Sequence, residues 1–462
     1  MSFEHTNETQ IETPINFTQP SESTPAKTII VHISKMESFI CSLNPAASLY
    51  EDVTDEDEIK QCFLELKDYL KPLNIKLITV EDALLLKGCQ EDLMRLAKDS
   101  LSYERETKID PELLKEEYGD LMGKSPVKGE NSENNSPSKN SNSNESPSKR
   151  KNSFEEYCLF SSDGYKEKVL KKFSKKHLIN IILTRPVMKL RHTDKDTFIE
   201  STSITFFPLG NLVFCIDQQI TTKKGVVIGR SRTNQRKYEH IIMKQVFKNL
   251  KVNVVGEVTE GFLEGGDFFV ARENLSMLGI GLRTDITAAK YLMEKDLLGT
   301  RYMALCYDEK DLDQQRMHLD TYFNILNDKN VVVIDFDQVG KKVDKEIGRK
   351  VYYFDNEKDA KEIKSDKDGI GNKYGEYKLI KIFDNFYQFL DEMNFKYIKI
   401  THEEQMKYMI NFLNIGNNTV ISVNKDLEEK VKHLGITVKY FDCQPILNMY
   451  GGMHCMTQVS RS

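Results

Sequence analysis

Short apolar runs recur along the chain after residue 200 and predict β-strands. These runs lie at 204–207, 211–217, 225–230, 252–258, 268–271, 275–281, 300–308, 331–337, 397–400, 419–424 and 435–442. Between some of them, apolar residues recur at helical spacing, at 233–250, 284–297, 376–394 and 402–414. The order strand, strand, helix, strand therefore repeats, which favours a repeated αβ unit over one open doubly wound sheet.

The chain before residue 200 begins with the same kinds of element. Residues 28–33 (TIIVHI) predict a buried strand, residues 55–73 a helix, and residues 75–80 a second strand. Residues 82–122 and 165–190 carry apolar residues at the spacing of helices. Together these elements indicate an α/β fold.

Two segments have a polar composition that cannot bury much apolar area. Residues 1–26 contain four glutamates and no arginine, so they resemble neither a secretory signal nor a transit peptide. We expect them to form a disordered leader. Residues 123–153 are rich in Asn, Ser, Lys, Pro and Glu and contain the word SPSK twice, which predicts a disordered linker.

The overall composition is that of a soluble globular protein, with 39% apolar and 29% charged residues and a net charge of −6. This balance argues against nucleic acid or an anionic membrane as the main partner. No apolar stretch approaches the roughly 20 residues that span a bilayer. The eight cysteines form no CxxC pair and no cluster with histidine, so neither a disulfide framework nor a metal site is indicated. We expect a reducing compartment, the cytoplasm.

A cysteine near the carboxyl end is a candidate nucleophile. Cys455 closes the stretch GGMHC and has polar and soft neighbours rather than an apolar run. Two glycines before it allow the backbone to bend or to approach another group closely. The alternative is a buried, inert thiol. Thiolate chemistry requires a group that handles protons and groups that orient the substrate.

Three other stretches supply a histidine and carboxylates. Glu264 and Asp267 flank a Gly-Gly pair, which is typical of a ligand site or of an acidic hairpin. His318 and Asp320 would point to the same face of an extended segment, unless the histidine is satisfied by its neighbour. Asp217 ends an apolar run, where a turn aspartate is also common.

Taken together, one thiol, one histidine and several carboxylates suit a guanidinium group as substrate. A guanidinium is a planar cation rich in N–H donors, and carboxylates accept from its fork of donors. Its central carbon becomes electrophilic enough for thiolate attack once its charge is held in place. Histidine is suited to move the protons.

The words LEGGD (263–267), MHLD (317–320) and GGMHC (451–455) occur in this order and resemble those of the guanidino-group-modifying, or pentein, superfamily. The resemblance is greatest to arginine deiminases. It extends to PLGNLVFCIDQQITTKKGVVIGR (208–230), LGIGLRTD (278–285) and EEQMKYMINFLNIG (403–416), and covers about 28–122 and 154–462.

The resemblance implies an α/β fold made of five αβ modules, a pentein propeller around a central substrate channel. The catalytic domain would comprise residues 27–462. A helical insertion at 88–200 would follow the first module and contain the linker 123–153.

The resemblance also implies catalytic roles for five residues. Cys455 would be the nucleophile and His318 the general acid and base. Glu264 would keep the histidine oriented and protonated, because a nearby carboxylate favours the imidazolium. Asp217 and Asp320 would hold the guanidinium nitrogens.

Four more residues would bind or support the substrate. Arg236 and Arg283 match arginines that bind the α-carboxylate of the substrate, with Asn211 assisting. For Arg236 the alternative is a surface charge on a helix. Asp267 matches the second acid of the family's Glu-Gly-Gly-Asp word and would contact substrate or support the turn.

The chain departs from the family pattern at two places. Ile216 precedes Asp217 where the family commonly has arginine, and Tyr450 lies where arginine deiminases carry an arginine before the terminal glycines. One contact to the substrate carboxylate is therefore missing, which weakens the case for free arginine over another guanidino compound. His454 would point away from the nucleophile in an extended chain and is interpreted as a supporting residue.

The implied activity is hydrolysis of L-arginine to L-citrulline and ammonia through a covalent cysteine adduct, without metal or organic cofactor. An amidinotransferase of the same superfamily, which resolves the adduct with an amine, is one alternative. A non-catalytic guanidino-binding protein is another. The expected partner is a small guanidino molecule, and a homo-oligomer is compatible with the sequence.

Overall fold

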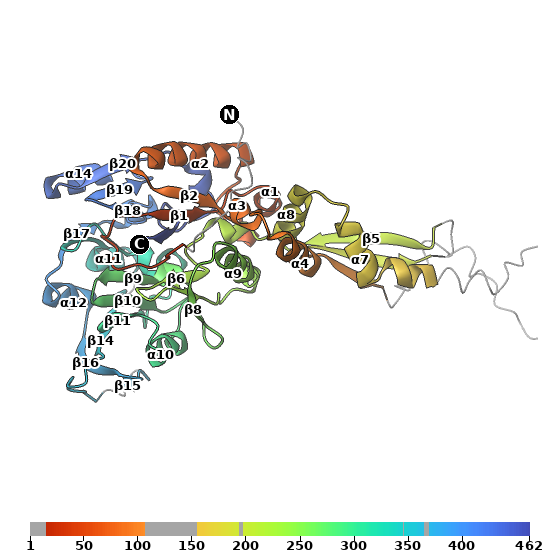
Figure 1. The fold of residues 1–462 in the computed structure, drawn as a ribbon. Coiled ribbons are helices and arrows are strands. Elements are labelled where there is room, and N and C mark those ends of the chain that lie inside the picture. Colours follow the sequence, from red (N-terminus) through yellow and green to blue (C-terminus); the bar gives the residue numbers. More distant parts are fainter. Residues whose placement is uncertain (1–14, 107–154, 194–196, 345, 365–368) are drawn as a thin grey trace, which may run out of the picture. The chain divides into compact units, whose positions relative to one another are not determined.

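The computed structural model describes residues 15–106, 155–193, 197–344, 346–364 and 369–462 (Figure 1). The predicted linker at 123–153 and the first part of the predicted leader lie outside these residues. The chain divides into two units, which are described separately. Unit 1 comprises Met1–Asp92 and Pro208–Ser462, and unit 2 comprises Leu93–Phe207. Both contain helices and strands, so the fold is mixed α/β.

The strands of unit 1 form groups of three in which the central strand has one antiparallel and one parallel neighbour. Among the described residues there are five such groups: β21 (Gln458–Ser460), β1 (Thr28–Val31) and β2 (Lys76–Thr79); β6 (Gln219–Thr221), β7 (Val226–Ile228) and β8 (Val254–Glu257); β9 (Phe268–Arg272), β10 (Leu275–Ile280) and β11 (Tyr302–Tyr307); β12 (Phe323–Ile325), β13 (Asn330–Ile334) and β17 (Lys396–Ile400); and β18 (Leu413–Gly416), β19 (Thr419–Ser422) and β20 (Thr437–Tyr440).

At least one helix lies in the chain between the two strands of each parallel pair, as a parallel crossover requires. In chain order these helices are α1 (Met36–Ser42) and α2 (Glu56–Leu70), α9 (Glu239–Asn249), α10 (Ile286–Glu294), α11 (Phe336–Val343) and α12 (Phe386–Glu392), and α14 (Leu427–Val431). The described residues of unit 1 also form the short helices α3 (Val80–Leu84), α13 (His402–Met406) and α15 (Gln444–Leu447). The order strand, strand, helix, strand that the sequence predicts thus recurs in this unit.

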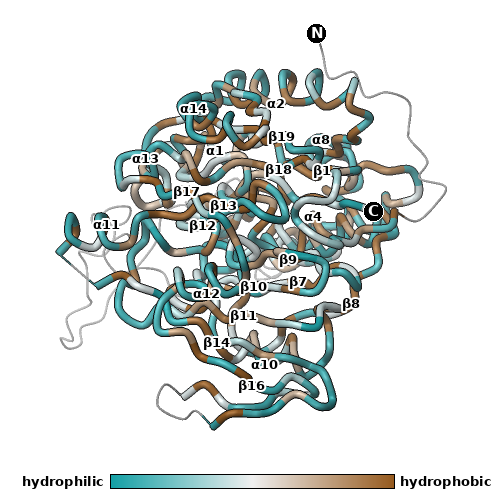
Figure 2. The backbone as a smooth tube through the Cα atoms, turned by 90° about the vertical axis from the view of Figure 1, so that its left-hand side faces the viewer, coloured by the Kyte–Doolittle hydropathy of each residue, from teal (hydrophilic) through white to brown (hydrophobic). Residues whose placement is uncertain are grey.

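Helix α2 shows how local sequence sets an element. The side chain of Asp55 accepts hydrogen bonds from the N–H groups of Asp57 and Glu58, which caps the helix. Ile59, Phe63 and other apolar residues at helical spacing are buried, and Figure 2 shows this alternation of hydrophobic and hydrophilic colour along the helix. Among the described residues, no helix is long and apolar enough to cross a lipid bilayer.

The third strand group is extended to a six-stranded sheet, β15-β16-β14-β11-β10-β9, by β14 (Lys350–Asp355), β15 (Lys373–Tyr374) and β16 (Tyr377–Phe383). The predicted helix at 376–394 is therefore wrong over β16, where burial alternates as in a strand. The predicted strand at 211–217 is also wrong, because this stretch forms the 3-10 turn η3 (Gly210–Val213) and irregular backbone. Nearly every residue of that run is buried, and periodicity does not identify the conformation of such a run.

Unit 2 contains most of α4 (Gln90–Ser100), together with α7 (Asp163–Leu170) and α8 (Lys175–Thr184). It also contains a three-stranded sheet of β3 (Ser102–Arg105), β4 (Pro186–His192) and β5 (Ile199–Phe206). The described part of the insertion is thus not purely helical, contrary to the prediction. Helix α8 ends because Arg185 is left-handed at φ +46° and Pro186 cannot continue the helix.

Residues 15–26, which we call the amino-terminal segment, do not form the expected disordered leader. The ring of Phe17 is 0% exposed and packs edge to face on Phe247, with 5.6 Å between ring centroids. The backbone N–H groups of Gln19, Glu22 and Ala26 donate to carbonyls of unit 1 at 2.8–3.0 Å. The segment is polar on average, so its composition did not indicate that one buried aromatic ring and several backbone hydrogen bonds hold it in place.

Replacing Phe17 with alanine should lower the free energy of unfolding by about 3–5 kcal/mol, because it removes a fully buried aromatic ring. Chemical denaturation measures this change. Phe39→Ala is the matched control, since Phe39 on α1 is 53% exposed, and it should change stability by about 0.5 kcal/mol or less. Equal changes for the two variants would contradict the packing of the amino-terminal segment.

Candidate active site

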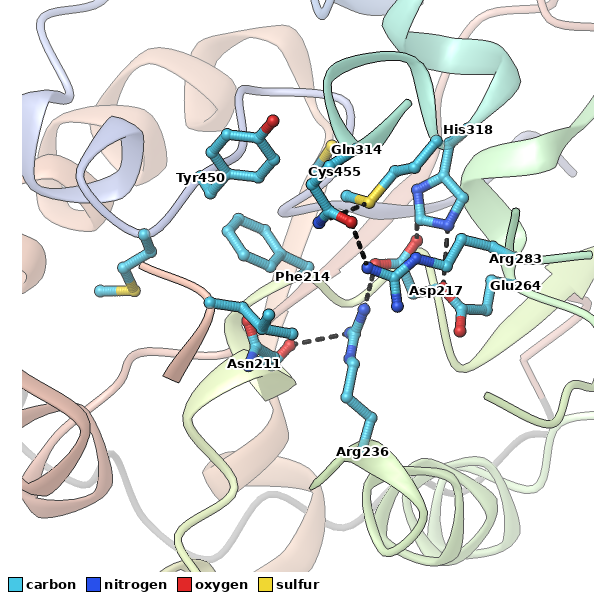
Figure 3. A pocket seen from close by; sticks show the side chains of 13 residues that line it. Asn211, Phe214, Asp217, Arg236, Glu264, Arg283, Gln314, His318, Tyr450 and Cys455 are labelled. Atoms are coloured by element: carbon cyan, nitrogen blue, oxygen red, sulfur yellow. Dashed lines mark hydrogen bonds and ion pairs between the residues drawn. The ribbon is translucent and has the colours of Figure 1, made fainter. Parts of the chain in front are cut away.

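A pocket in unit 1 brings most of the predicted site residues together (Figure 3). The predicted residues that line it are Asn211, Asp217, Arg236, Glu264, Arg283, His318 and Cys455. The remaining lining residues are Leu49, Phe214, Gln314, Met317, Met449 and Tyr450. Asp320 and Asp267 are not among the lining residues. Asp320 nevertheless contacts Cys455, and Asp267 contacts Leu319, the residue that follows His318.

The polar side chains of the pocket come from turns and loops between the strands. Five short 3-10 turns carry or adjoin them: η3 (Gly210–Val213), η4 (Asn234–Arg236), η5 (Gly265–Asp267), η6 (Gln314–Arg316) and η7 (Leu319–Thr321). Buried strands therefore hold short irregular segments in place, and these segments present the polar groups.

His318 and Glu264 form a buried ion pair. Each residue caps a 3-10 turn with extended backbone, and His318 Nε2 donates to Glu264 Oε2 at 2.9 Å. Burial lowers the pKa of His318, but the charge of Asp217 and the hydrogen bond with Glu264 outweigh burial and raise this pKa to about 9. Burial raises the pKa of Glu264, but the hydrogen bond and charge of His318 hold it well below its usual value. The imidazole is therefore protonated at neutral pH.

The Gly-Gly pair beside Glu264 is required by close packing. A Cβ atom on Gly266 would lie 2.8 Å from His318 Nδ1, and one on Gly265 would lie 1.9 Å from the carbonyl oxygen of Ile216. Only glycine lets the imidazole rest against this backbone. The structure thus places Glu264 and Asp267 around a 3-10 turn rather than in a hairpin.

Asp217 accepts hydrogen bonds on both carboxylate oxygens. Its Oδ1 accepts from Gly266 N–H at 3.3 Å and lies 3.8 Å from His318 Nδ1. Its Oδ2 accepts from Arg236 Nη1 at 2.6 Å. Arg236 also donates to Glu239 at 2.9 Å and to the carbonyl of Asn211 at 3.0 Å. Since Arg236 is only 5% exposed, the surface-charge interpretation of this residue is wrong.

Each of the three guanidinium nitrogens of Arg236 donates a hydrogen bond, but this is not so for Arg283. Its Nη2 donates to Gln314 Oε1 at 3.0 Å, whereas its buried Nε has no hydrogen-bond partner among the described residues. Figure 3 shows both arginine side chains reaching toward the interior of the pocket. Gln314 was not predicted, since nothing in the local sequence distinguishes it from an ordinary polar turn residue.

Cys455 is held by Asn411, another residue that the sequence did not single out. Asn411 Nδ2 donates to Cys455 Sγ at 3.1 Å, and Asn411 Oδ1 accepts from Cys455 N–H at 3.1 Å. A Cβ atom on Gly452 would lie 2.8 Å from that amide oxygen. Met453 and Met456 are fully buried in the apolar cluster that includes β1 and α2, which anchors the segment.

The surroundings of Cys455 favour the neutral form of its thiol. Burial raises the pKa of the thiol well above its usual value, and the charges of Asp320 and Asp217 raise it further. Cys455 is 8% exposed, and its sulfur donates to Asp320 Oδ2 at 3.5 Å. A cation bound beside these carboxylates would lower the pKa of the thiol.

His318 and Asp320 contact different groups, contrary to the expectation of a shared face, because the turn η7 begins between them. Asp320 Oδ2 accepts from His454 Nδ1 at 2.8 Å. Asp267 Oδ1 accepts from the N–H of Leu319 at 3.0 Å, so its position favours support of the turn over substrate contact. Burial raises the pKa of Asp267 to about 7.

This arrangement suits a small planar cation. Carboxylates, an imidazolium and a thiol line one pocket, together with two arginines, two amides and several apolar or aromatic side chains. Among the described residues, no group of three or more His, Cys, Asp or Glu side chains could hold a metal ion. The chemistry that the pocket offers is nucleophilic attack by sulfur with proton transfer by histidine.

Several arginine deiminases are similar in sequence. The arginine deiminase of Halobacterium salinarum is 25% identical over 332 residues, covering 54% of this chain and 64% of that protein. That of Limosilactobacillus reuteri is 28% identical over 177 residues, covering 36% of this chain and 43% of that protein. The chain thus spans 43% and 64% of the length of these two relatives in the matched regions.

Two solved structures also match the structure of this chain in part. The amino-terminal domain of ArgZ bound to product, an arginine dihydrolase from cyanobacteria, matches with a TM-score of 0.39 and 16% identity, covering 59% of this chain and 79% of that chain. A dimethylarginine dimethylaminohydrolase adduct matches with a TM-score of 0.37 and 18% identity, covering 54% and 79%.

The strongest of these findings is the match to a whole family. The family model described as "Arginine deiminase" matches residues 120–461, which is well over half of the chain. This range includes every candidate site residue predicted from the sequence. The chain therefore belongs to the arginine deiminase family.

Proposed function

We propose that this protein hydrolyses the guanidinium group of L-arginine to give L-citrulline and ammonia. The observation that carries the proposal is the convergence of Cys455, the His318–Glu264 ion pair and Asp217 on one pocket. The family assignment supports the same reaction. Each residue role below is part of the proposal.

Binding of the substrate exchanges one guanidinium for another. Asp217 is paired with the guanidinium of Arg236, and the guanidinium of the substrate takes this place. Arg236 is thereby released toward the α-carboxylate of the substrate, where Arg283 offers its unpartnered Nε and Asn211 assists. Asp320 holds a second side of the substrate cation through its free oxygen.

The reaction then proceeds in two halves. The bound cation lowers the pKa of the Cys455 thiol, which releases its proton to solvent, and the sulfur of the thiolate bonds to the guanidinium carbon. The C–N bond to the terminal nitrogen breaks, His318 donates a proton to that nitrogen, and ammonia leaves. Neutral His318 accepts a proton from water as the water oxygen bonds to the carbon. The C–S bond breaks and the second proton of the former water molecule passes to solvent, which releases citrulline and restores the thiolate.

We further propose that the five strand groups of unit 1 close into a five-module propeller. Their shared pairing pattern, one antiparallel and one parallel neighbour around each central strand, supports this. A cytoplasmic location is supported by the cysteines, all eight of which are free thiols. Self-association into a homo-oligomer is part of the same proposal, and arginine is its small-molecule partner.

Cys455→Ala should reduce the formation of citrulline and ammonia to background, because no nucleophile remains, while arginine still binds. Calorimetry measures the binding, and mass spectrometry of the intact protein trapped with an arginine analogue should place the adduct on Cys455. Cys89→Ala is the matched control, since Cys89 is a half-buried thiol outside the pocket, and it should retain the wild-type rate.

The same assay distinguishes the alternatives. A guanidinoacetate-like product from arginine and glycine, without citrulline, would indicate an amidinotransferase. Binding of arginine with no turnover in either the intact protein or Cys455→Ala would indicate a binding protein.

The value of kcat/KM should rise about tenfold per pH unit below pH 9. The reactive form contains an imidazolium and a thiolate, which is one proton fewer than the free enzyme holds. The pKa of His318 is about 9 and that of Cys455 lies above its usual value, so both groups are protonated at lower pH. Steady-state kinetics with arginine measures the slope. A profile that is flat between about pH 6 and 8 would contradict these protonation states.

Tyr450→Arg should lower the KM for arginine by about tenfold, because it adds a charge-assisted contact to the α-carboxylate. Tyr450 lines the pocket and already has φ +77°, so another side chain adds little new backbone strain. A guanidino compound that lacks the carboxylate should show no such gain. Tyr450→Phe is the control and should leave KM within about twofold. A gain for both compounds would refute the assignment of this wall to the carboxylate.

A further inference from the structure

The amino-terminal segment brings a carboxylate close to the nucleophile's segment. Glu22 is buried and lies outside residues 120–461, the part of the chain that the family model matches. Its backbone N–H donates to the carbonyl of Val270 in β9 at 2.8 Å, which fixes its position. Nothing in the local sequence or in the motifs of the pocket assigns a role to it.

A continuous series of contacts connects Glu22 to the sulfur of Cys455. Glu22 Oε1 lies 3.8 Å from His454 Nε2. His454 Nδ1 donates to Asp320 Oδ2 at 2.8 Å, and the same Asp320 oxygen accepts from Cys455 Sγ at 3.5 Å. All four side chains are buried, so water does not screen the charges between them.

The surroundings of His454 favour its charged form. The titratable and charged groups around it are Asp320 from η7, Glu22 from the amino-terminal segment, Cys455 beside it in sequence, and Arg461, whose Nη2 donates to Glu22 Oε1 at 3.0 Å. Phe269 of β9 stacks on the imidazole with 5.0 Å between centroids. Burial lowers the pKa of His454, but the hydrogen bond with Asp320 and the negative charges of Asp320 and Glu22 raise it to about 9.

Only one oxygen of Asp320 is engaged in this way. Its Oδ1 is buried and has no hydrogen-bond partner among the described residues. His454 therefore fixes the rotation of the carboxylate and leaves its second oxygen without a hydrogen bond from the described residues. A neutral imidazole could not balance the charge of Asp320 beside the sulfur in the same way.

We propose that Glu22 is a positioning residue for the reaction: it holds His454 as an imidazolium, and His454 in turn orients Asp320 beside Cys455. This inference rests on the proposed function for its kinetic consequence. It makes the amino-terminal segment part of the active site's support, and not only an anchor to the core.

A cycle of variants tests whether Glu22 acts through His454. Glu22→Gln keeps the shape of the side chain and removes its charge. It should lower kcat for arginine about tenfold in the wild-type background and by less than about twofold in the His454→Asn background. Equal effects in both backgrounds would overturn the proposal, because a purely structural contribution is independent of residue 454.

The pH dependence supplies a readout that a packing defect does not change. Without Glu22, His454 should lose its proton at lower pH, so the ratio of Glu22→Gln to wild-type kcat should fall as pH rises from about 6 to 9. A constant ratio across this range would overturn the proposal. Thr18→Val is the matched control. The hydroxyl oxygens of Thr18 and Ser462 lie 2.6 Å apart, so this hydrogen bond also connects the amino-terminal segment to the carboxyl end, but without a charge. It should keep the wild-type kcat and pH profile.

A second measurement keeps the inference separate from the proposed function. The rate at which iodoacetamide alkylates Cys455, followed by mass spectrometry of its peptide at pH 8, needs no turnover. Glu22→Gln should slow this alkylation several-fold, and should have no effect in the His454→Asn background. If arginine is not hydrolysed but this pattern holds, the proposed function fails and the positioning role stands. If arginine is hydrolysed and Glu22→Gln alkylates at the wild-type rate, the positioning role fails.

Discussion

The ion pair between His318 and Glu264, buried and 2.9 Å long, is the interaction on which the rest of the site depends. A charge removed from water is tolerated when a partner of opposite sign lies next to it. The same rule holds around the pocket, where Asp217 pairs with Arg236 and Asp320 with His454. Each of these three cations is therefore balanced by a carboxylate from another segment of the chain.

These pairs also explain why the thiol rests in its neutral form. Asp320 and Asp217 raise the pKa of Cys455, and the cations nearest to these acids are already engaged with them. A positively charged ligand bound beside these acids would offset their charge and lower the pKa of the thiol. A protonated sulfur is less open to oxidation than a thiolate.

Much of the site could be predicted because its residues lie in short sequence motifs. Glu264, His318 and Cys455 each lie beside glycines or a second acid, and such clusters stand out in a sequence. Asn411, Gln314 and the contact of Glu22 with His454 could not be predicted, since each is a single polar residue that three-dimensional proximity makes relevant.

The fold, too, could be predicted from the sequence only in part. Short apolar runs predicted β1, β2 and most later strands. Residues 211–217 are buried nearly throughout, so their hydrophobic pattern has no periodicity that could identify the backbone conformation. The helix expected at 376–394 is present as α12 but wrong over β16, which packs onto an extended sheet, a tertiary contact that overrides local preference.

The antiparallel pairing of β1 with β21 has a consequence for biosynthesis. Strand β1 is synthesised long before β21, which follows Cys455 closely in the sequence. The carboxylates of Asp217 and Glu264 are therefore synthesised before the thiol of Cys455. Because Cys455 and β21 are neighbours in the chain, pairing of β21 with β1 also fixes the segment that carries the thiol.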